Sequence, residues 1–153
     1  MGCGCASKPA HKILVLGLDG SGKTTLLQKL GNHNHIETIT PVKGFNVKSV
    51  ENDKYKFIAW DLGGDKKIRL LWKKYYQGIN GIIFVVDASD KDRLDMVREE
   101  IRKLLEEPEL KDVSMIVYVN RLPVGEQSID HIKQKLGLNN IMDRKWQIEK
   151  VDA

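Results

Sequence analysis

The stretch GLDGSGKTTL, residues 17–26, continues from the apolar run KILVLG at residues 12–17. An uninterrupted apolar run is typical of a strand buried on both faces of a parallel sheet. Residues 24–30, TTLLQKL, have the pattern of a helix, and we expect Gly31 to cap its end. Glycine is a poor residue inside either element. The glycines at this join therefore indicate a specialised loop between a strand and a helix.

From Gly17 to Thr24 the chain matches the pattern G-x-x-x-x-G-K-[ST], in the strand–loop–helix context that the pattern requires. Glycines let successive backbone N–H groups point at one centre, and the helix N-terminus adds partial positive charge. Lys23 is expected to reach the outer phosphates of a nucleoside triphosphate, and the Thr24 hydroxyl to ligate Mg²⁺. The alternative is a tight glycine turn with an exposed lysine. The expected nucleotide-binding residues of this loop are Gly17, Asp19, Gly20, Ser21, Gly22, Lys23, Thr24 and Thr25.

A second landmark, WDLGG at residues 60–64, ends another expected strand. An acid at a strand end near a phosphate loop can hold Mg²⁺ through water, so Asp61 is the second metal candidate. The two glycines after it would let a backbone N–H approach the terminal phosphate and let the loop move when that phosphate leaves. Gly64 is therefore a further nucleotide-binding candidate. The alternative is an ordinary turn at the end of a strand.

The rest of the chain alternates strands and helices, which predicts an α/β domain with a mostly parallel sheet. FNVKSV and YKFIAW, at 45–50 and 55–60, alternate in polarity and indicate a hairpin. Residues 32–44 are expected to form a polar loop. Further strands are expected at 81–87, at 114–120 and in KWQIEKV at 145–151, and further helices at 92–106 and 128–137.

Composition narrows the class of protein. The 153 residues suit one domain, and 30% charged with 41% hydrophobic residues is an ordinary globular balance. The net charge of +4 permits an anionic ligand or a membrane surface without requiring nucleic acid. We expect no transmembrane helix, because the sequence contains no apolar stretch of the length needed. The only cysteines, Cys3 and Cys5, cannot staple a fold, so we expect an intracellular protein with reduced thiols.

The N-terminal arm, residues 1–11, carries a possible lipidation signal. Removal of Met1 exposes Gly2, but N-myristoylation prefers Ser or Thr where this chain has Ala6. Cys3 and Cys5 beside an acylated glycine would be natural palmitoylation sites, and two acyl chains anchor stably where one holds weakly. The alternative is a disordered tail with incidental cysteines.

The chain resembles the Arf and Arf-like branch of the Ras superfamily of small GTPases. The stretches that carry the resemblance are GLDGSGKTTLL, PVKGFNV, WDLGGDKKIRLLWKKYY, GIIFVVDASDKDRL and KLGL, in the family's order from about residue 12 to about residue 148. The resemblance implies the three-layer P-loop NTPase fold of small G proteins, with a mostly parallel sheet and an antiparallel interswitch hairpin at 45–60. It implies a G domain over residues 12–153 that binds GTP or GDP with Mg²⁺ and hydrolyses GTP to GDP.

The resemblance also implies partners and a location. Effector proteins would bind through the two switch loops and the hairpin, and no nucleic acid is expected. An acylated N-terminus would hold this cytoplasmic protein on intracellular membranes such as the Golgi, where it would act as a molecular switch in vesicle-mediated transport.

Four departures from the family pattern bear on activity. Val42 follows Pro41 where the family has a threonine on Mg²⁺, and Asp65 takes the catalytic position of the glutamine that orients the attacking water. In the base-binding motif Asn120 and Arg121 are kept as nucleotide-binding candidates, but Pro123 stands where an aspartate binds guanine. The family's final Ser-Ala-Lys loop and last helix have no counterpart within residues 12–153.

These departures predict slow GTP hydrolysis and poor discrimination of guanine. Thr40 could supply the missing hydroxyl if the loop slips by one residue. Two other functions stay open: an interaction module that keeps the fold but binds nucleotide weakly, and an ATP-using P-loop kinase or ATPase. The ATP-using enzyme is the weakest of these alternatives, because WDLGG and the hairpin are typical of the switch family.

Overall fold

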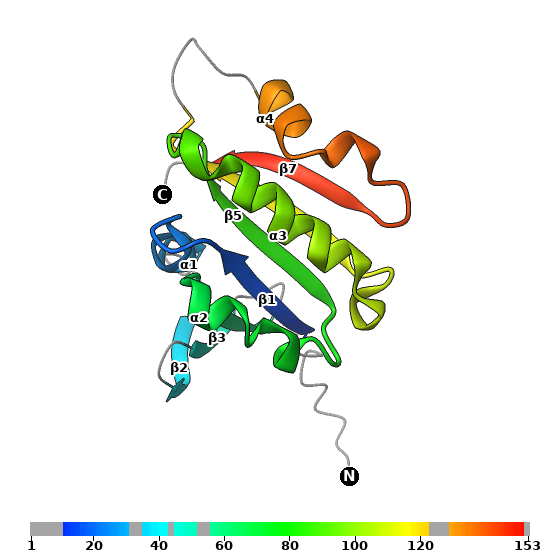
Figure 1. Cartoon of the computed structure of the whole chain (residues 1–153). Coiled ribbons are helices and arrows are strands. Elements are labelled where there is room, and N and C mark those ends of the chain that lie inside the picture. The colour runs from blue at the N-terminus through cyan, green and yellow to red at the C-terminus, as the bar shows by residue number, and fades with distance from the viewer. Residues whose placement is uncertain (1–10, 31–34, 43–44, 52–55, 123–128, 152–153) are drawn as a thin grey trace.

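A seven-stranded sheet runs through the middle of the molecule (Figure 1). The computed structural model describes residues 11–30, 35–42, 45–51, 56–122 and 129–151. The strands are β1 (His11–Gly17), β2 (His35–Val42), β3 (Phe45–Glu51), β4 (Lys56–Leu62), β5 (Gly81–Asp87), β6 (Ser114–Asn120) and β7 (Trp146–Val151). The α-helices are α1 (Lys23–Leu30), α2 (Lys66–Arg69), α3 (Leu94–Glu106) and α4 (Ile129–Lys135). The 3₁₀ turns are η1 (Trp72–Tyr75), η2 (Lys91–Arg93), η3 (Pro108–Leu110) and η4 (Leu138–Asn140).

The strand order is β2-β3-β4-β1-β5-β6-β7. From β4 through β1, β5 and β6 to β7, each strand is parallel to the next. On the other side of β4, strand β3 runs antiparallel to it. The expected mostly parallel sheet with its hairpin is therefore confirmed. Strand β1 lies between β4 and β5, with Ile13 opposite both Ala59 and Gly81. The loop that leaves β1 consequently emerges between the ends of two neighbouring strands.

The polar loop expected at 32–44 is wrong for its described part, because residues 35–42 form the edge strand β2. This strand pairs antiparallel with β3, with Ile36 opposite Val50 and Thr40 opposite Val47. Its isoleucines, threonines and valine have branched Cβ atoms that favour a strand, although its polar content suggests a loop. Pro41 is tolerated because an edge strand leaves one row of backbone groups unpaired.

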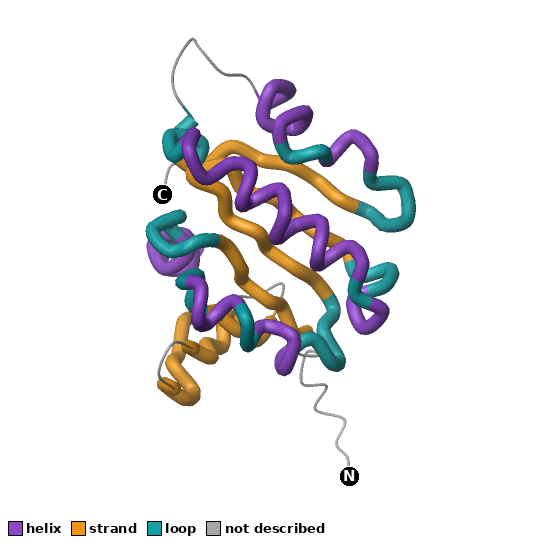
Figure 2. The backbone as a smooth tube through the Cα atoms, viewed as in Figure 1, coloured by secondary structure: helices purple, strands orange, loops and turns teal. Residues whose placement is uncertain are grey.

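Helices cover both faces of the sheet and give the three layers (Figure 2). Leu14 and Leu16 of β1 join a core cluster with α3, α4 and η1 on one face. Val15, which points the other way, packs with Leu26 and Leu27 of α1. Alternation along a strand thus supplies two separate cores, as a strand buried on both faces requires.

Helix α3 follows the predicted spacing. Its buried residues are Leu94, Val97, Ile101 and Leu104, and the helix ends before Pro108. Gly137, expected to cap the next helix, has a left-handed φ of 71° just beyond α4. Within the described ranges, no helix has the length and apolar character needed to cross a membrane.

Candidate functional site

The glycine-rich loop between β1 and α1 wraps around the side chain of Lys23. Gly20 and Gly22 have φ angles of 75° and 98°, which a residue with a Cβ rarely adopts. Lys23 is only 8% exposed, and its Nζ donates to the carbonyl oxygens of Gly17 at 3.2 Å and Leu18 at 3.4 Å. The alternative of a glycine turn with an exposed lysine is therefore contradicted.

Asp61 at the end of β4 supplies the opposite charge near this lysine. It lies opposite Val15 in the sheet and is 5% exposed. Burial raises the pKa of Asp61, and the nearby positive charges of Lys23 and Lys48 oppose that effect. Burial likewise lowers the pKa of Lys23, while Asp61 and Asp19 act to raise it. Two buried ionisable groups of opposite charge, Asp61 near the end of β4 and Lys23 at the start of α1, thus influence each other's pKa at this edge of the sheet.

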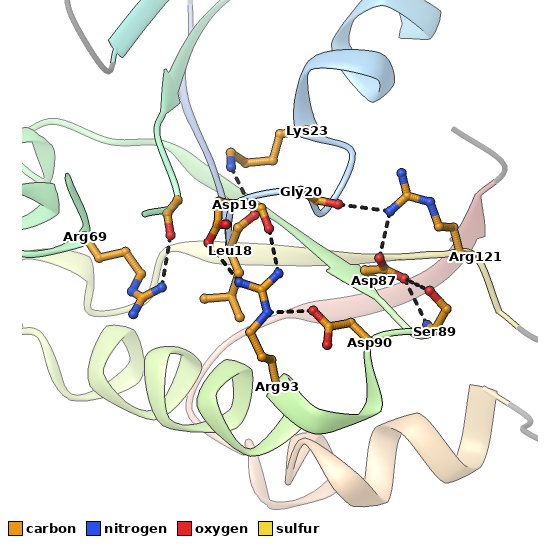
Figure 3. A network of polar contacts seen from close by, with 11 residues as sticks. Leu18, Asp19, Gly20, Lys23, Arg69, Asp87, Ser89, Asp90, Arg93 and Arg121 are labelled. Carbon is orange, nitrogen blue, oxygen red and sulfur yellow. Dashed lines mark hydrogen bonds and ion pairs between the residues drawn. The ribbon is translucent and has the colours of Figure 1, made fainter. Parts of the chain in front are cut away.

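Three side chains donate hydrogen bonds to carbonyl oxygens of the loop, and Figure 3 shows two of them, Arg93 and Arg121. Arg93 donates to the carbonyl oxygen of Asp19 at 2.8 Å, and Arg121 to that of Gly20 at 2.9 Å. Asn120, fully buried, donates through Nδ2 to the carbonyl oxygen of Ser21 at 3.1 Å. The N–H of a trans peptide points opposite to its carbonyl. The N–H groups that follow these carbonyls therefore point away from the three anchoring side chains.

The two anchoring arginines are themselves paired with acids. Arg121 contacts Asp87 Oδ2 at 2.7 Å, and Arg93 contacts Asp90 Oδ2 at 2.6 Å. Burial acts to raise the pKa of Asp87, but hydrogen bonds from Ser89 and Arg121 outweigh it and keep that pKa low. Asp87, Asp90 and Arg93 were not predicted. The available signal was the position of Asp87 at the carboxyl end of a buried parallel strand, where binding sites of α/β sheets gather.

The Gly63–Gly64 turn rests on the phosphate loop. A Cβ on Gly64 would overlap the backbone of Gly17, Leu18 and Asp19. Trp72 Nε1 donates to the carbonyl oxygen of Gly63 at 2.9 Å, and the Arg69 guanidinium donates to that of Gly64 at 3.0 Å. The turn is therefore fixed both by its fit to the loop and by donors from the segment that follows it.

Arg69 connects this turn to α3. Its Nε lies 3.3 Å from Glu100 Oε1, and the two side chains are only 10% and 12% exposed. A charge pair shielded from water in this way is screened less than a surface pair. Neither residue was predicted, because their separation along the sequence gives no indication that they meet.

Asp65, the residue expected at the catalytic position, is the N-cap of α2. Its Oδ1 accepts a hydrogen bond from the backbone N–H of Ile68 at 3.0 Å. Aspartate is among the preferred N-cap residues because its oxygen satisfies a backbone donor at the start of a helix. The exposed Asp65 side chain thus has a local structural role in this conformation.

The structure brings most of the predicted loop residues together with Asp61 and Gly64. Thr24 and Thr25 lie exposed in the first turn of α1. Val42 is the last residue of β2, opposite Phe45. Four predicted positions lie outside the described residues: Gly2, Cys3, Cys5 and Pro123. Gly31, the expected helix cap, lies outside them as well.

The donor set suits a hard cation held together with phosphates. Across the described residues there is no cluster of three or more His, Cys, Asp and Glu side chains that could hold a metal by itself. Mg²⁺ is usually bound by one or two protein oxygens together with substrate phosphates and water. The hydroxyl of Thr24 and the buried carboxylate of Asp61 are ligands of this kind, next to a lysine able to bind phosphate.

Comparisons with known proteins agree with this geometry. The family model described as "ADP-ribosylation factor family" matches residues 4–153. The chain is 44% identical over 147 residues to ADP-ribosylation factor J of Dictyostelium discoideum, covering 95% of this chain and 78% of that protein. Among solved structures it is similar to the Arl6 BBS3 small GTPase from Trypanosoma brucei with the bound nucleotide analogue GppNp. That match has a TM-score of 0.81 and 31% identity, and covers 94% of this chain and 87% of the other. The chain belongs to the ADP-ribosylation factor family of small GTPases.

Proposed function

We propose that this chain is a GTP-operated switch that acts at membranes in vesicle trafficking, with slow GTP hydrolysis and weak selectivity for guanine. The observation that carries the proposal is the phosphate loop closed around the buried Lys23, with Asp61 and Gly64 beside it. In this proposal Lys23 and the loop N–H groups bind the phosphates. Thr24 and Asp61 hold Mg²⁺, which neutralises charge on the phosphates. Asn120 and Arg121 support the loop beneath the base.

Slow hydrolysis follows from two positions. Catalysis of phosphoryl transfer depends on positioning and electrostatics, and a glutamine or equivalent must orient the attacking water. Asp65 is shorter than glutamine, is acceptor-only when ionised, and already accepts the Ile68 N–H. Val42 has no hydroxyl with which to help hold Mg²⁺.

Weak selectivity for guanine follows from the base-binding motif. Arg121 is engaged with Gly20 and Asp87, so it supports the loop rather than forming hydrogen bonds to a base. Pro123 has no side-chain acceptor for the guanine N–H groups. The motif therefore keeps Asn120 and Arg121, which support the loop, and lacks the acidic residue that would discriminate between bases.

The membrane part of the proposal rests on Gly2, Cys3 and Cys5. Acylation of the glycine and of one cysteine would provide the two anchors that stable membrane attachment needs. The net charge of +4 is compatible with an anionic membrane surface. Effectors would bind at the hairpin β3–β4 and at the segment that carries Gly64.

A non-switching interaction module is the second candidate, and a specific observation favours it. Both segments expected to switch already have partners inside the protein. Residues 35–42 pair with β3 in the sheet. The carbonyl oxygens of Gly63 and Gly64 accept hydrogen bonds from the side chains of Trp72 and Arg69. A protein in which these contacts persist with every nucleotide would keep the fold without switching.

Hydrogen exchange separates the two candidates. The protein would be loaded with Mg²⁺ and either GDP or a non-hydrolysable GTP analogue, and amide exchange compared over 35–51 and 61–76. A switch predicts changed protection in both segments, because GTP-dependent order is confined to such loops. Unchanged protection in both segments, with nucleotide bound, would establish the interaction module instead.

A further inference from the structure

The phosphate loop contains a carboxylate, and one arginine is wrapped around it. Arg93, at the end of η2, donates from one terminal nitrogen to Asp19 Oδ1 and from the other to the Asp19 carbonyl oxygen, each at 2.8 Å. Its Nε contacts Asp90 Oδ2 at 2.6 Å. All three guanidinium nitrogens are thus occupied (Figure 3). Such multiple contact is characteristic of arginine and is not available to lysine.

Asp19 lies among the groups that would surround the phosphates. It directly follows Leu18, whose carbonyl oxygen accepts from Lys23 Nζ, and its backbone nitrogen is one of the atoms that a Cβ on Gly64 would overlap. The charge of Asp19 also acts on Lys23, since it helps to raise the pKa of that lysine. A negative charge here is therefore close enough to influence an anion bound at Lys23.

This carboxylate is ionised at neutral pH. The hydrogen bond from Arg93 is the main reason that the pKa of Asp19 lies below its usual range, and Arg69 adds a smaller effect. An ionised acid in a phosphate loop repels phosphate unless a cation compensates it. The compensating cation with direct contact is Arg93, 2.8 Å from Asp19.

We propose that Arg93 determines the preference of the site for nucleoside triphosphate over diphosphate, by neutralising Asp19 within the phosphate loop. The inference rests on the proposed nucleotide binding and adds a specificity role that the loop motif does not contain. Arg93 is a positioning and charge-compensating residue, since it touches the loop rather than the reacting atoms. Without Arg93, the negative charge of Asp19 would repel every phosphate of the nucleotide. A triphosphate carries more negative charge than a diphosphate, so its binding would be weakened more.

The expected effect is measurable. The Asp19 side chain is 61% exposed, so solvent screens its charge, and its effect on a bound phosphate should change an equilibrium by roughly two- to fivefold. Arg93→Gln, which keeps a neutral amide donor for the Asp19 carbonyl, should lower the ratio of GTP affinity to GDP affinity by about this factor. Arg93→Ala should lower that ratio equally. It should also weaken the binding of both nucleotides, because the loop loses the hydrogen bond to the Asp19 carbonyl oxygen.

The decisive comparison adds Asp19→Asn, which removes the charge and keeps the size. Affinities for GDP and for a non-hydrolysable GTP analogue would be measured by titration in Mg²⁺ for Arg93→Gln, Asp19→Asn and the double variant. The double variant should recover the parent ratio. If it keeps the lowered ratio, or if Arg93→Gln leaves the ratio unchanged, Arg93 acts only as a structural support and the proposal is wrong.

Arg102→Ala is the matched control, because Arg102 lies on the exposed face of α3 and, among the described residues, forms its ion pairs with Glu99 and Glu106. It should leave the ratio unchanged, and a lowered ratio would contradict the specific role of Arg93. Thermal unfolding without nucleotide identifies any variant that fails to fold. A parent protein that binds neither nucleotide overturns the proposed function itself. Binding by the parent with an unaltered ratio in the folded Arg93 variants overturns this inference alone.

Discussion

Gly64 packs so closely on the phosphate loop that a Cβ at this position would overlap the carbonyl oxygen of Gly17. Gly17 is the last residue of β1, and Gly64 lies just after β4, the parallel neighbour of β1. The contact places the turn after Asp61 directly on the loop around Lys23. Any ligand that alters the position of the phosphate loop must therefore also act on this turn.

The first prediction concerns this contact. Gly64→Ala should destabilise the protein by about 1–3 kcal/mol, because the added methyl group meets backbone that cannot move aside without shifting the loop. Gly81→Ala is the matched control, since its Cβ would lie 3.1 Å from the Cδ1 of Ile13, the end of a flexible side chain. Chemical denaturation would measure both. Equal, small losses in the two variants would show that the Gly64 contact is not restrictive.

The fold could largely be predicted because its central strands are continuous apolar runs and its loop has a known motif. Residues 81–87 and 114–120 form strands as expected. Strand β2 was missed because its polar residues and Pro41 suggest a loop, and only pairing with β3 decides between strand and loop.

The site was only partly predictable. Lys23, Asp61 and Gly64 follow from motif and strand order, whereas Arg93 and Arg69 reach the loop from segments distant in sequence. The capping role of Asp65 was also missed. Its signal was local: an acid one residue before a helix start is a common N-cap.

The second prediction concerns Asp65. Asp65→Gln should speed single-turnover GTP hydrolysis, because a glutamine amide can orient water. It should also lower stability by about 1 kcal/mol, because the cap of α2 is lost. Combined with Val42→Thr, the gain in rate should exceed that of either change alone. Phosphate release from preloaded protein measures the rate.

Asp65→Asn is the control for this pair of effects, since asparagine caps helices about as well as aspartate but carries no charge. It should keep the stability of the parent. A parent hydrolysis rate equal to that of the Asp65→Gln, Val42→Thr double variant would show that these two positions do not limit turnover.

The third prediction concerns the base. Competition titrations should show a weak preference for GTP over ATP, since each missing charge-assisted hydrogen bond to guanine forfeits about 1.5–3 kcal/mol. Pro123→Asp should raise that preference at least tenfold, because 1.4 kcal/mol corresponds to about a tenfold change in affinity. Strong selectivity in the parent would mean that another residue recognises guanine.

The fourth prediction concerns membrane attachment. Full-length protein expressed in cells should fractionate partly with membranes, and Gly2→Ala should release it, because a myristoyl group cannot be attached without that glycine. The paired change Cys3→Ser, Cys5→Ser should release it partly, since one acyl chain still holds weakly. Recovery of the parent entirely in the soluble fraction would contradict the lipid anchor.

A direct titration tests whether the loop around Lys23 binds the phosphates of a guanine nucleotide. GDP and GTP affinities of the purified protein would be measured in Mg²⁺, together with Lys23→Ala and with Lys111→Ala, an exposed lysine at the opposite ends of the parallel strands. We expect the parent and Lys111→Ala to bind both nucleotides. Lys23→Ala should weaken the binding of both nucleotides by roughly a hundredfold or more, since charge-assisted hydrogen bonds to phosphate are lost. Equal affinity of Lys23→Ala and the parent, or a parent that binds neither nucleotide, would show that the loop does not bind nucleotide phosphates through Lys23.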